Sequence, residues 1–420
     1  VFHMTAGSDE ATEPVPTPME TTNSDSAEEL PIRQALKLGE RAALQDFAYS
    51  QGGFKSRDLR RDAWVFLLGL SPEEAEDESW REQLLEEPVS EAKVMEADVL
   101  RSVCSWDVHT SIPEDVRDIK RAQLSEVMRA ILTRHSGTLA YFQGFHDVVL
   151  VFLEVGSPSC AYHMVERLAL FHISDQLCWP FDDGLLPLLG VLFNLLQMLD
   201  RPLANALAEA GCAEMHFAVP WVLSWFAHSL PRIQQVTRLF DCLLSSHPSA
   251  LLYFCAALLI HHRDILLATE RDMPEMVAAI QSLPLKDLEV DIWVESSRRL
   301  MTKVSPSWLL WRLGRRCKVP VTSPLRHYPH PWMAVEDEAD EPPLHVDLLL
   351  MAPIYLHKSG QLKVRSTFPL SMRALQQRLV NLALGVIKVG TSGSVLVLAL
   401  ALALYTMGAN DSNSRYFVGF

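Results

Sequence analysis

The chain has 420 residues, 49% of them hydrophobic, which excludes an intrinsically disordered protein and allows one large domain or two of ordinary size. Its formal net charge of −15 argues against nucleic acid as a partner, because phosphate backbones are bound by basic surfaces. No two of the seven cysteines are closer than thirteen positions, which excludes a Cys-x-x-Cys metal or redox pair and suits reduced thiols in the cytosol.

The N-terminal part, residues 1–48, is expected to be a disordered acidic segment. Its first thirty residues carry seven acidic side chains and no Lys or Arg, with prolines, serines and threonines between them. Such a composition does not bury enough apolar surface to order itself. The segment also lacks the basic start and the apolar core of a secretory signal peptide.

Residues 52–300 are predicted to form an all-α domain, since apolar residues recur there at helical spacing and alternating strand patterns are hard to find. One helix is expected to begin near Ser111 and Glu114, which have the spacing of a capping box. A central helix is predicted over Leu139–Val155, which is apolar nearly all round. Several prolines stand where they open helices, Pro202 and Pro220 among them.

Residues 301–388 are expected to form a linker and a basic juxtamembrane region. The linker contains a basic cluster, which we interpret as a solvated face, with contact to lipid as the alternative. An acidic run follows it, and the stretch from 348 to 388 then holds six basic residues and no acid. The basic cluster consists of Arg312, Arg315, Arg316 and Lys318.

Residues 389–409 contain no charge and are about 30 Å long as a helix, which is enough to span a bilayer. We predict a C-terminal transmembrane tail anchor there; a buried core helix is the alternative. The basic stretch before it places the body of the protein on the cytosolic side. The weakly apolar start of the span suits a thin membrane, so the endoplasmic reticulum or the Golgi is expected, without a choice between them.

Motifs of self-contained catalysis are absent from the sequence: there is no Gly-rich phosphate loop, no G-x-S-x-G, no H-E-x-x-H and no kinase signature. His261 and His262 are adjacent rather than on one helix face, and no partner pair is spaced to complete a metal site with them. We therefore expect neither a metal nor a cofactor of the protein's own.

Two segments stand out. Arg60 and Trp64 are four residues apart and therefore share one face of a helix. Gln143 lies in the segment Tyr-Phe-Gln-Gly-Phe-His-Asp, residues 141–147, within the predicted central helix. Taken alone, Gln143 is most simply a core amide that bonds to the backbone.

In this order, the R-x-x-x-W and Y-x-Q-G elements resemble those of the TBC family of Rab GTPase-activating proteins. The resemblance covers residues 52–300 and extends through Pro220–Phe226, with its Ser-Trp-Phe, and through Arg238 to Asp241. It implies a multi-helix TBC domain whose partner is a Rab small GTPase in its GTP form. GTP and Mg²⁺ then belong to the Rab.

The resemblance also implies roles for individual residues. Gln143 occupies the position of the family's glutamine finger, which orients the attacking water. The family's second finger is the arginine of an I-x-x-D-x-x-R motif, and here the matching segment, residues 104–110, ends in Thr110. The supporting positions are Arg60, Trp64, Asp107, Tyr141, Gly144 and Asp147.

The missing arginine leaves the mechanism open. An arginine supplied in trans raises the hydrolysis rate about 10³- to 10⁵-fold, and a threonine hydroxyl carries no charge with which to do so. Arg101 and Arg117 are the nearest substitutes, and each requires an unusual local fold. The sequence is therefore consistent with an activator of early secretory Rabs that uses a non-standard arginine, with a catalytically impaired Rab-binding protein, or with a helical membrane scaffold whose motif residues serve packing.

Overall fold

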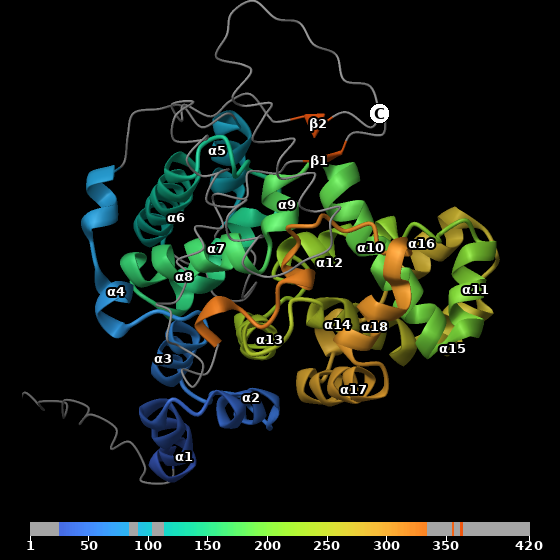
Figure 1. Cartoon of the computed structure of the whole chain (residues 1–420), viewed down its shortest axis with the longest axis horizontal. Coiled ribbons are helices and arrows are strands. Elements are labelled where there is room, and N and C mark those ends of the chain that lie inside the picture. Colours follow the sequence, from blue (N-terminus) through green and yellow to red (C-terminus); the bar gives the residue numbers. More distant parts are fainter. Residues whose placement is uncertain (1–24, 84–90, 103–112, 334–354, 357–361, 364–420) are drawn as a thin grey trace, which may run out of the picture. The chain divides into compact units, whose positions relative to one another are not determined.

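The computed structural model describes residues 25–83, 91–102, 113–333, 355–356 and 362–363 (Figure 1). The chain divides into two compact units, residues 1–351 and 352–420, which are considered separately. In the described part of the second unit, strands β1 (Tyr355–Leu356) and β2 (Leu362–Lys363) pair antiparallel, with Tyr355 opposite Lys363.

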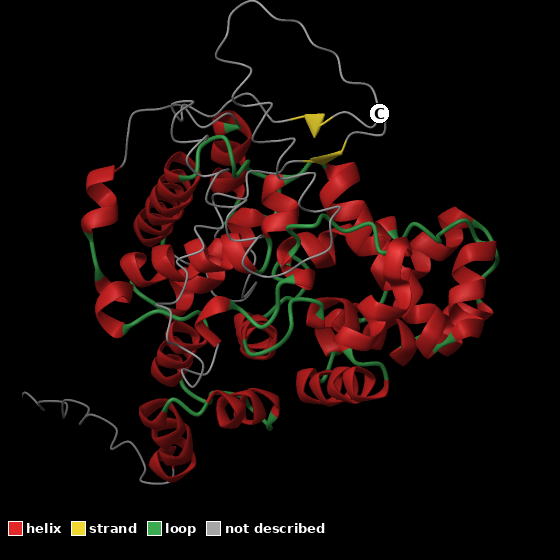
Figure 2. Cartoon of the chain, viewed as in Figure 1, coloured by secondary structure: helices red, strands yellow, loops and turns green. Residues whose placement is uncertain are grey.

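All regular elements among the described residues of the first unit are helices, joined by loops, which confirms the predicted all-α fold (Figure 2). Short 3-10 helices join some of its α-helices. The α-helices are α1 (Asp25–Leu38), α2 (Arg41–Tyr49), α3 (Arg57–Leu67), α4 (Pro72–Glu76), α5 (Ala92–Arg101), α6 (Glu114–Arg134), α7 (Phe145–Val155), α8 (Pro158–Phe171), α9 (Ser174–Cys178), α10 (Phe181–Leu199), α11 (Arg201–Glu209), α12 (Val219–Ser224), α13 (Ile233–Leu244), α14 (Ala250–His261), α15 (Arg263–Ala268), α16 (Met273–Gln281), α17 (Val290–Lys303) and α18 (Pro306–Leu313). The 3-10 helices are η1 (Ser79–Gln83), η2 (His216–Ala218), η3 (Leu285–Asp287), η4 (Gly314–Arg316), η5 (Pro324–Arg326) and η6 (Pro331–Met333).

Helix starts follow local chemistry. Ser56 caps α3 by accepting a hydrogen bond from the backbone N–H of Leu59, and Ser71 forms a capping box with Glu74 at the start of α4. Pro202 and Pro220 lie in the first turns of α11 and α12, where a missing N–H costs nothing. The predicted capping box at Ser111 and Glu114 is wrong: α6 begins at Glu114, and the residue before it is Pro113, which has no side-chain cap and cannot continue the helix backward. Ser111 itself lies outside the described residues.

The predicted central helix over Leu139–Val155 is wrong at its start. Helix α7 begins at Phe145, because Gly144 adopts φ = 112°, a left-handed conformation that ends any right-handed helix before it. The preceding segment is irregular and is tied to α9 by a hydrogen bond from the N–H of Ala140 to the carbonyl of Leu177 (2.8 Å). Gln143 is consequently an exposed turn residue and not part of a helix.

The expectation of disorder over residues 1–48 is wrong from Asp25 onward, where α1 and α2 form. The acidic composition of this part hid its helical pattern. Ile32 and Leu44 belong to apolar stripes that are almost completely buried in the core. The guanidinium of Arg238 on α13 donates hydrogen bonds to the carbonyls of Ala48 and Ser50 at the end of α2. Residues 1–24 lie outside the described part.

The predicted linker over residues 301–388 begins with residues that pack in the first unit. In α18, Leu309 and Leu313 are buried, and burial continues at Leu325. Farther along, the indole of Trp332 donates to the carbonyl of Leu67 (3.0 Å), and its ring leaves no room for a side chain at Gly69. Packing in this unit therefore extends to Met333.

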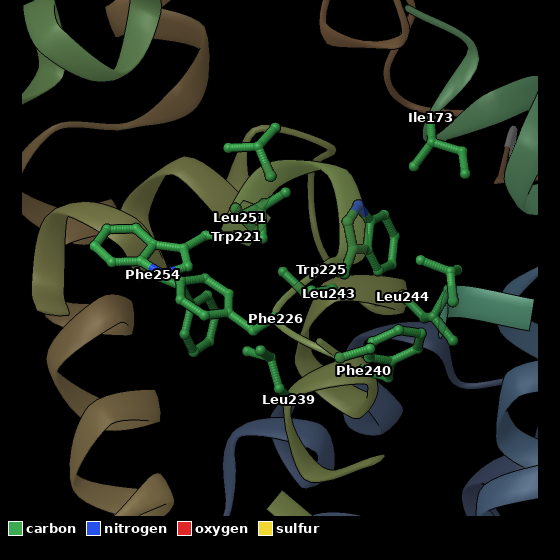
Figure 3. Close-up of a cluster of buried hydrophobic side chains, with 14 of the residues drawn as sticks. Ile173, Trp221, Trp225, Phe226, Leu239, Phe240, Leu243, Leu244, Leu251 and Phe254 are labelled. Atoms are coloured by element: carbon green, nitrogen blue, oxygen red, sulfur yellow. The ribbon is translucent and has the colours of Figure 1, made fainter. Parts of the chain in front are cut away.

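An aromatic cluster at the centre of the first unit joins α12, α13 and α14 (Figure 3). Helix α12 ends at Ser224, and both Trp225 (φ = 50°) and Phe226 (φ = 63°) are left-handed, which is rare for bulky residues. Both side chains are buried: Trp225 lies against Phe240 (5.3 Å between ring centroids), and Phe226 stacks on Trp221 (5.5 Å). Aromatic burial offsets the backbone strain of this turn.

One described helix is long and apolar enough to cross a membrane, namely α10. It packs against α11 and α14, and residues such as Leu189 and Leu192 are fully buried. We interpret it as a core helix of the first unit. The predicted anchor at residues 389–409 lies outside the described residues, so it stays a prediction.

Candidate functional site

Asp241 on α13 is the centre of the first polar network, and its side chain is fully buried. Its carboxylate accepts two hydrogen bonds from the guanidinium of Arg60 (2.9 and 3.0 Å) and one from the indole of Trp64 (2.9 Å). The backbone N–H of Phe54 donates a fourth (3.3 Å). The structure thus joins Arg60 and Trp64 on α3 to the later Arg-x-x-Asp element, 181 residues farther along the chain.

Arg238 lies one helical turn before Asp241 and connects α13 to α17 and to the end of α2. Its Nε donates to Asp291 on α17 (2.8 Å), whose carboxylate also accepts from the backbone N–H of Gly52. Gly53 lies between these two networks, and a Cβ atom there would come within 2.3 Å of the Asp241 carboxylate. These contacts hold α2, α3, α13 and α17 together.

The Gln143 turn lies at the N-terminal end of α7. Helix α3 packs behind α7 through Trp64 and Phe152, whose ring centroids are 5.2 Å apart. Gln143 is exposed, and its carboxamide makes no hydrogen bond to any described residue. The backbone is fixed by the glycine that follows, so the turn presents an amide donor and an amide acceptor to solvent.

A row of polar contacts, most of them buried, runs from α5 past this turn to the loop after α12. The hydroxyl of Tyr141 donates to Asp98 on α5 (2.8 Å), so its oxygen accepts from Nδ1–H of His146 (2.9 Å). Nε2 of His146 lies 3.4 Å from Asp147 Oδ1, and Asp147 Oδ2 lies 3.2 Å from Nδ1 of His228. Tyr141 and Asp147, which flank Gln143 in sequence, are thereby held between α5 and the loop after α12.

Burial and neighbouring charges shift the pKa of three side chains in this row of contacts, namely Tyr141, His146 and His228. Burial lowers the pKa of His146, although Asp147 and Asp98 partly oppose that shift. Burial and the hydrogen bond to Asp98 raise the pKa of the Tyr141 hydroxyl. At one end, hydrogen bonding to Asp147 raises the pKa of His228, whose side chain is 68% exposed. At the other, Arg101 is 70% exposed and paired with Asp98.

Thr110 and Asp107 lie outside the described residues, so the position of the missing arginine has no geometry to report. Both suggested substitutes are described. Arg101 pairs with Asp98, at one end of the row of polar contacts beside the Gln143 turn. Arg117 on α6 pairs with Glu114 (2.9 Å). Of the two, Arg101 is therefore the one linked to the Gln143 turn.

Sequence reasoning missed Asp98, His146, His228 and Asp291. His146 lies three residues after Gln143 in the same motif segment, and this nearness in sequence could have indicated that His146 belongs to the site. Asp98 and its partner Tyr141 are 43 positions apart, a separation at which no spacing rule predicts contact. Among the residues that the structure describes, no group of three or more His, Cys, Asp or Glu side chains is arranged to hold a metal ion.

A family model, the Rab-GTPase-TBC domain, matches residues 57–267. Human "TBC1 domain family member 20" is 28% identical over 280 residues, which is 66% of this chain and 68% of that protein. The bovine protein of the same name is 28% identical over 64% of each chain. A "GTPase-activating protein gyp10" of Schizosaccharomyces pombe is 29% identical over 55% of this chain and 60% of its own length.

Two solved structures share the fold. The Chlamydomonas flagellar RabGAP TBC domain superposes with a TM-score of 0.51 at 18% identity, over 67% of this chain and 97% of that one. The Ypt/Rab-GAP domain of Gyp1p superposes with a TM-score of 0.53 at 17% identity, over 67% and 99%. At these identities the likeness shows the helical fold alone, and the family match confirms the resemblance seen in the motifs.

Proposed function

Since this chain belongs to the Rab-GTPase-TBC domain family, we propose that it is a GTPase-activating protein for Rab-family small GTPases. In the proposal, the Rab in its GTP form is the partner and brings GTP and Mg²⁺ with it. The TBC domain contributes side chains to the Rab's active site and has no reaction of its own. The relative named as a GTPase-activating protein in Schizosaccharomyces pombe supports the class of activity.

The exposed Gln143 turn carries this proposal. A Rab hydrolyses GTP slowly, because the attacking water is loosely held and the charge of the transferring phosphoryl group is poorly compensated. A carboxamide both donates and accepts hydrogen bonds, so it can orient a water toward the phosphorus. The backbone conformation of Gly144 and the polar contacts of Tyr141 and Asp147 hold Gln143 outward before a partner arrives. This preorganisation lowers the entropic cost of placing the carboxamide.

Thr110 favours a second candidate, a Rab-binding protein with impaired catalysis. The hydroxyl of Thr110 cannot replace an arginine that is worth about 10³- to 10⁵-fold in rate. Under this alternative, Gln143 contributes contacts only, and the protein holds its Rab without accelerating hydrolysis. Under the first candidate, a cation from another position, with Arg101 the first to test, supplies part of the missing charge.

The proposed setting is the cytosolic face of an early secretory membrane, the endoplasmic reticulum or the Golgi. It rests on the apolar span predicted at residues 389–409 and on the acid-free basic stretch before it. The span would hold the domain beside membrane-bound Rabs and raise its effective concentration there.

The test is single-turnover GTP hydrolysis by a panel of early secretory Rabs with the full chain, because residues on both sides of 52–300 pack in the core. Under the activator proposal, the unmodified chain accelerates hydrolysis, Gln143→Ala abolishes the acceleration, and Gln197→Ala, an exposed glutamine of α10, leaves it intact.

Thr110→Arg separates the two candidates. Acceleration only after this substitution would establish the Rab-binding candidate and contradict the activator. A Rab panel that neither binds nor responds to any variant would contradict both and favour the scaffold hypothesis.

A further inference from the structure

Helix α18 presents two tryptophans to solvent. Leu309 and Leu313 bury one side of this eight-residue helix against the core, whereas Trp308 is 44% exposed and Trp311 is 74% exposed. The two indoles are three residues apart and so lie on the same side of the helix. Val321, eight residues after the helix ends, is 80% exposed.

This exposure is unusual within the protein. Among the large hydrophobic residues of the described part of the chain, Val321 and Trp311 are the two most exposed. A single exposed apolar residue needs no explanation, but exposed apolar side chains gathered in one short segment indicate a contact surface. We call the six residues Trp308, Trp311, Arg312, Arg316, Lys318 and Val321 the tryptophan–arginine face.

The charged residues of this face are exposed to solvent. Arg312, Arg316 and Lys318 are exposed, and none forms an ion pair within the part of the chain that the structure describes. The sequence around them carries positive charge only: residues 296–335 contain eight Lys and Arg residues and no Asp or Glu, although the whole chain has a net charge of −15. The face is therefore a local positive region on an acidic protein.

We propose that the tryptophan–arginine face binds the anionic surface of a lipid bilayer. Tryptophan prefers the membrane–water interface, where its apolar ring leaves water while its indole N–H keeps a polar partner. Each Lys or Arg near an anionic leaflet adds an attraction that salt weakens. Two exposed indoles on one side of α18 and exposed cations in the same short segment match both requirements, and this combination favours a lipid surface over an acidic protein.

The predicted membrane span strengthens the argument. It begins at residue 389 of the same chain, 68 positions after Val321. A tethered face meets its bilayer at a high effective concentration, so a weak surface interaction is enough to orient the domain on the membrane. The orientation goes beyond the proposed activity toward Rabs and does not depend on it.

The experiment measures tryptophan fluorescence of the full chain in vesicles whose lipids carry bromine near the headgroup, a contact quencher. The predicted span contains no tryptophan, so it adds no signal of its own. We expect quenching in phosphatidylserine-containing vesicles and a loss of that quenching in the double variant Trp308→Ser/Trp311→Ser. Ile265→Ser, at an exposed residue of α15, is the control and should leave the quenching unchanged.

Charge variants test the lipid class. Reversal of Arg312, Arg316 and Lys318 to Glu should lower the quenching in anionic vesicles to its level in neutral phosphatidylcholine vesicles. The matched control reverses three exposed cations elsewhere, Arg33, Lys37 and Lys93, and should have no effect despite the same change in net charge. Unchanged helix content by circular dichroism must accompany each variant.

Two outcomes would overturn the proposal. One is wild-type quenching that the double variant retains, since the signal then comes from other tryptophans. The other is an absence of quenching in anionic vesicles, including the case in which the basic residues capture an acidic protein instead. Neither outcome bears on Rab hydrolysis, because the assay contains no GTPase.

Discussion

At the residue scale, the domain depends on a few buried charges with complete partners. Asp241 receives four hydrogen bonds from three residues, and two of the donors belong to the guanidinium of Arg60. A buried carboxylate in low dielectric is stable only with such partners. Arg60 and Trp64 are four residues apart because both side chains donate to the same acceptor, the Asp241 carboxylate.

Asp241→Asn should destabilise the protein by about 3–5 kcal/mol, because it removes the charge opposite a mostly buried Arg60. The new amide N–H group would also face donors instead of acceptors. Chemical unfolding followed by circular dichroism measures the change. Asp264→Asn is the control: the side chain of Asp264 is 95% exposed, so the loss of its ion pair with Arg263 should change the stability little. Equal losses in both variants would contradict the prediction.

His228 gives a second residue-scale prediction, on pH. Asp147 raises the folded-state pKa of His228. A raised pKa contributes stability that is fully present below the unfolded value of about 6.5 and is lost as pH rises through the folded pKa. Since the side chain is mostly exposed, the contribution should be below about 1 kcal/mol.

The measurement is the free energy of unfolding of the wild type and His228→Asn between pH 6 and pH 9. The advantage of the wild type should be largest at pH 6 and shrink toward pH 9. If the difference in unfolding free energy between the wild type and His228→Asn is constant with pH, or grows as pH rises, the His228–Asp147 pair is not its cause.

At the element scale, residues 323–333, which we call the strap, cover a group of buried histidines. His172, the residue that follows α8, lies 4.6 Å from His330 of the strap, and His247 lies 4.9 Å from Tyr328, both between ring centroids. Burial lowers the pKa of His247 to about 4 and that of His330 to about 3, and lowers the pKa of His172 well below its usual value. The nearby guanidinium of Arg41 acts in the same direction on His172 and His330.

Acid should therefore release the strap before it unfolds the core. Imidazoles that are neutral when folded contribute stability that is complete above the unfolded pKa of about 6.5 and is lost as pH falls from there toward the folded pKa values. Hydrogen exchange at pH 5 and pH 7.5, corrected for intrinsic rates, should show lost protection in residues 323–333 while α13 stays protected.

His330→Phe supplies the control for this prediction. It keeps an aromatic ring between Phe171 and Trp332 but has no group to protonate. The pH dependence of strap protection should therefore shrink in this variant. Equal loss of protection in the strap and in α13 of the wild type would mean that acid acts on the whole domain and not on this element.

At the scale of the whole molecule, membrane attachment is predicted to depend on residues 389–409. Their deletion should make the protein extractable from membranes with alkaline carbonate, whereas the intact chain should resist extraction, because about twenty apolar residues in a bilayer hold far more strongly than surface contacts. Fractionation followed by immunoblotting measures this. Deletion of residues 410–420 is the control and should change nothing. A carbonate-resistant deletion variant would place the anchor elsewhere.

The helical class and the order of the motifs could be predicted from the sequence, whereas the exposure of Gln143 could not. Helical periodicity is a local property of neighbouring residues, so residues 52–300 were correctly expected to be helical. The order of Arg60, Trp64, Gln143 and the Arg238–Asp241 element was enough to indicate the family. The sequence also showed directly that Thr110 stands in the arginine position.

Only the tertiary structure decided which residues meet. Asp98 and His228 brace the Gln143 turn from opposite ends of a row of polar contacts, and neither is near Gln143 in sequence. Gly144 starts α7 later than apolar periodicity predicted, because one left-handed residue outweighs a favourable pattern. The strap and the helices before residue 49 are ordered by packing against the core. Burial and polar pairing depend on the elements that surround a residue, which local pattern does not contain.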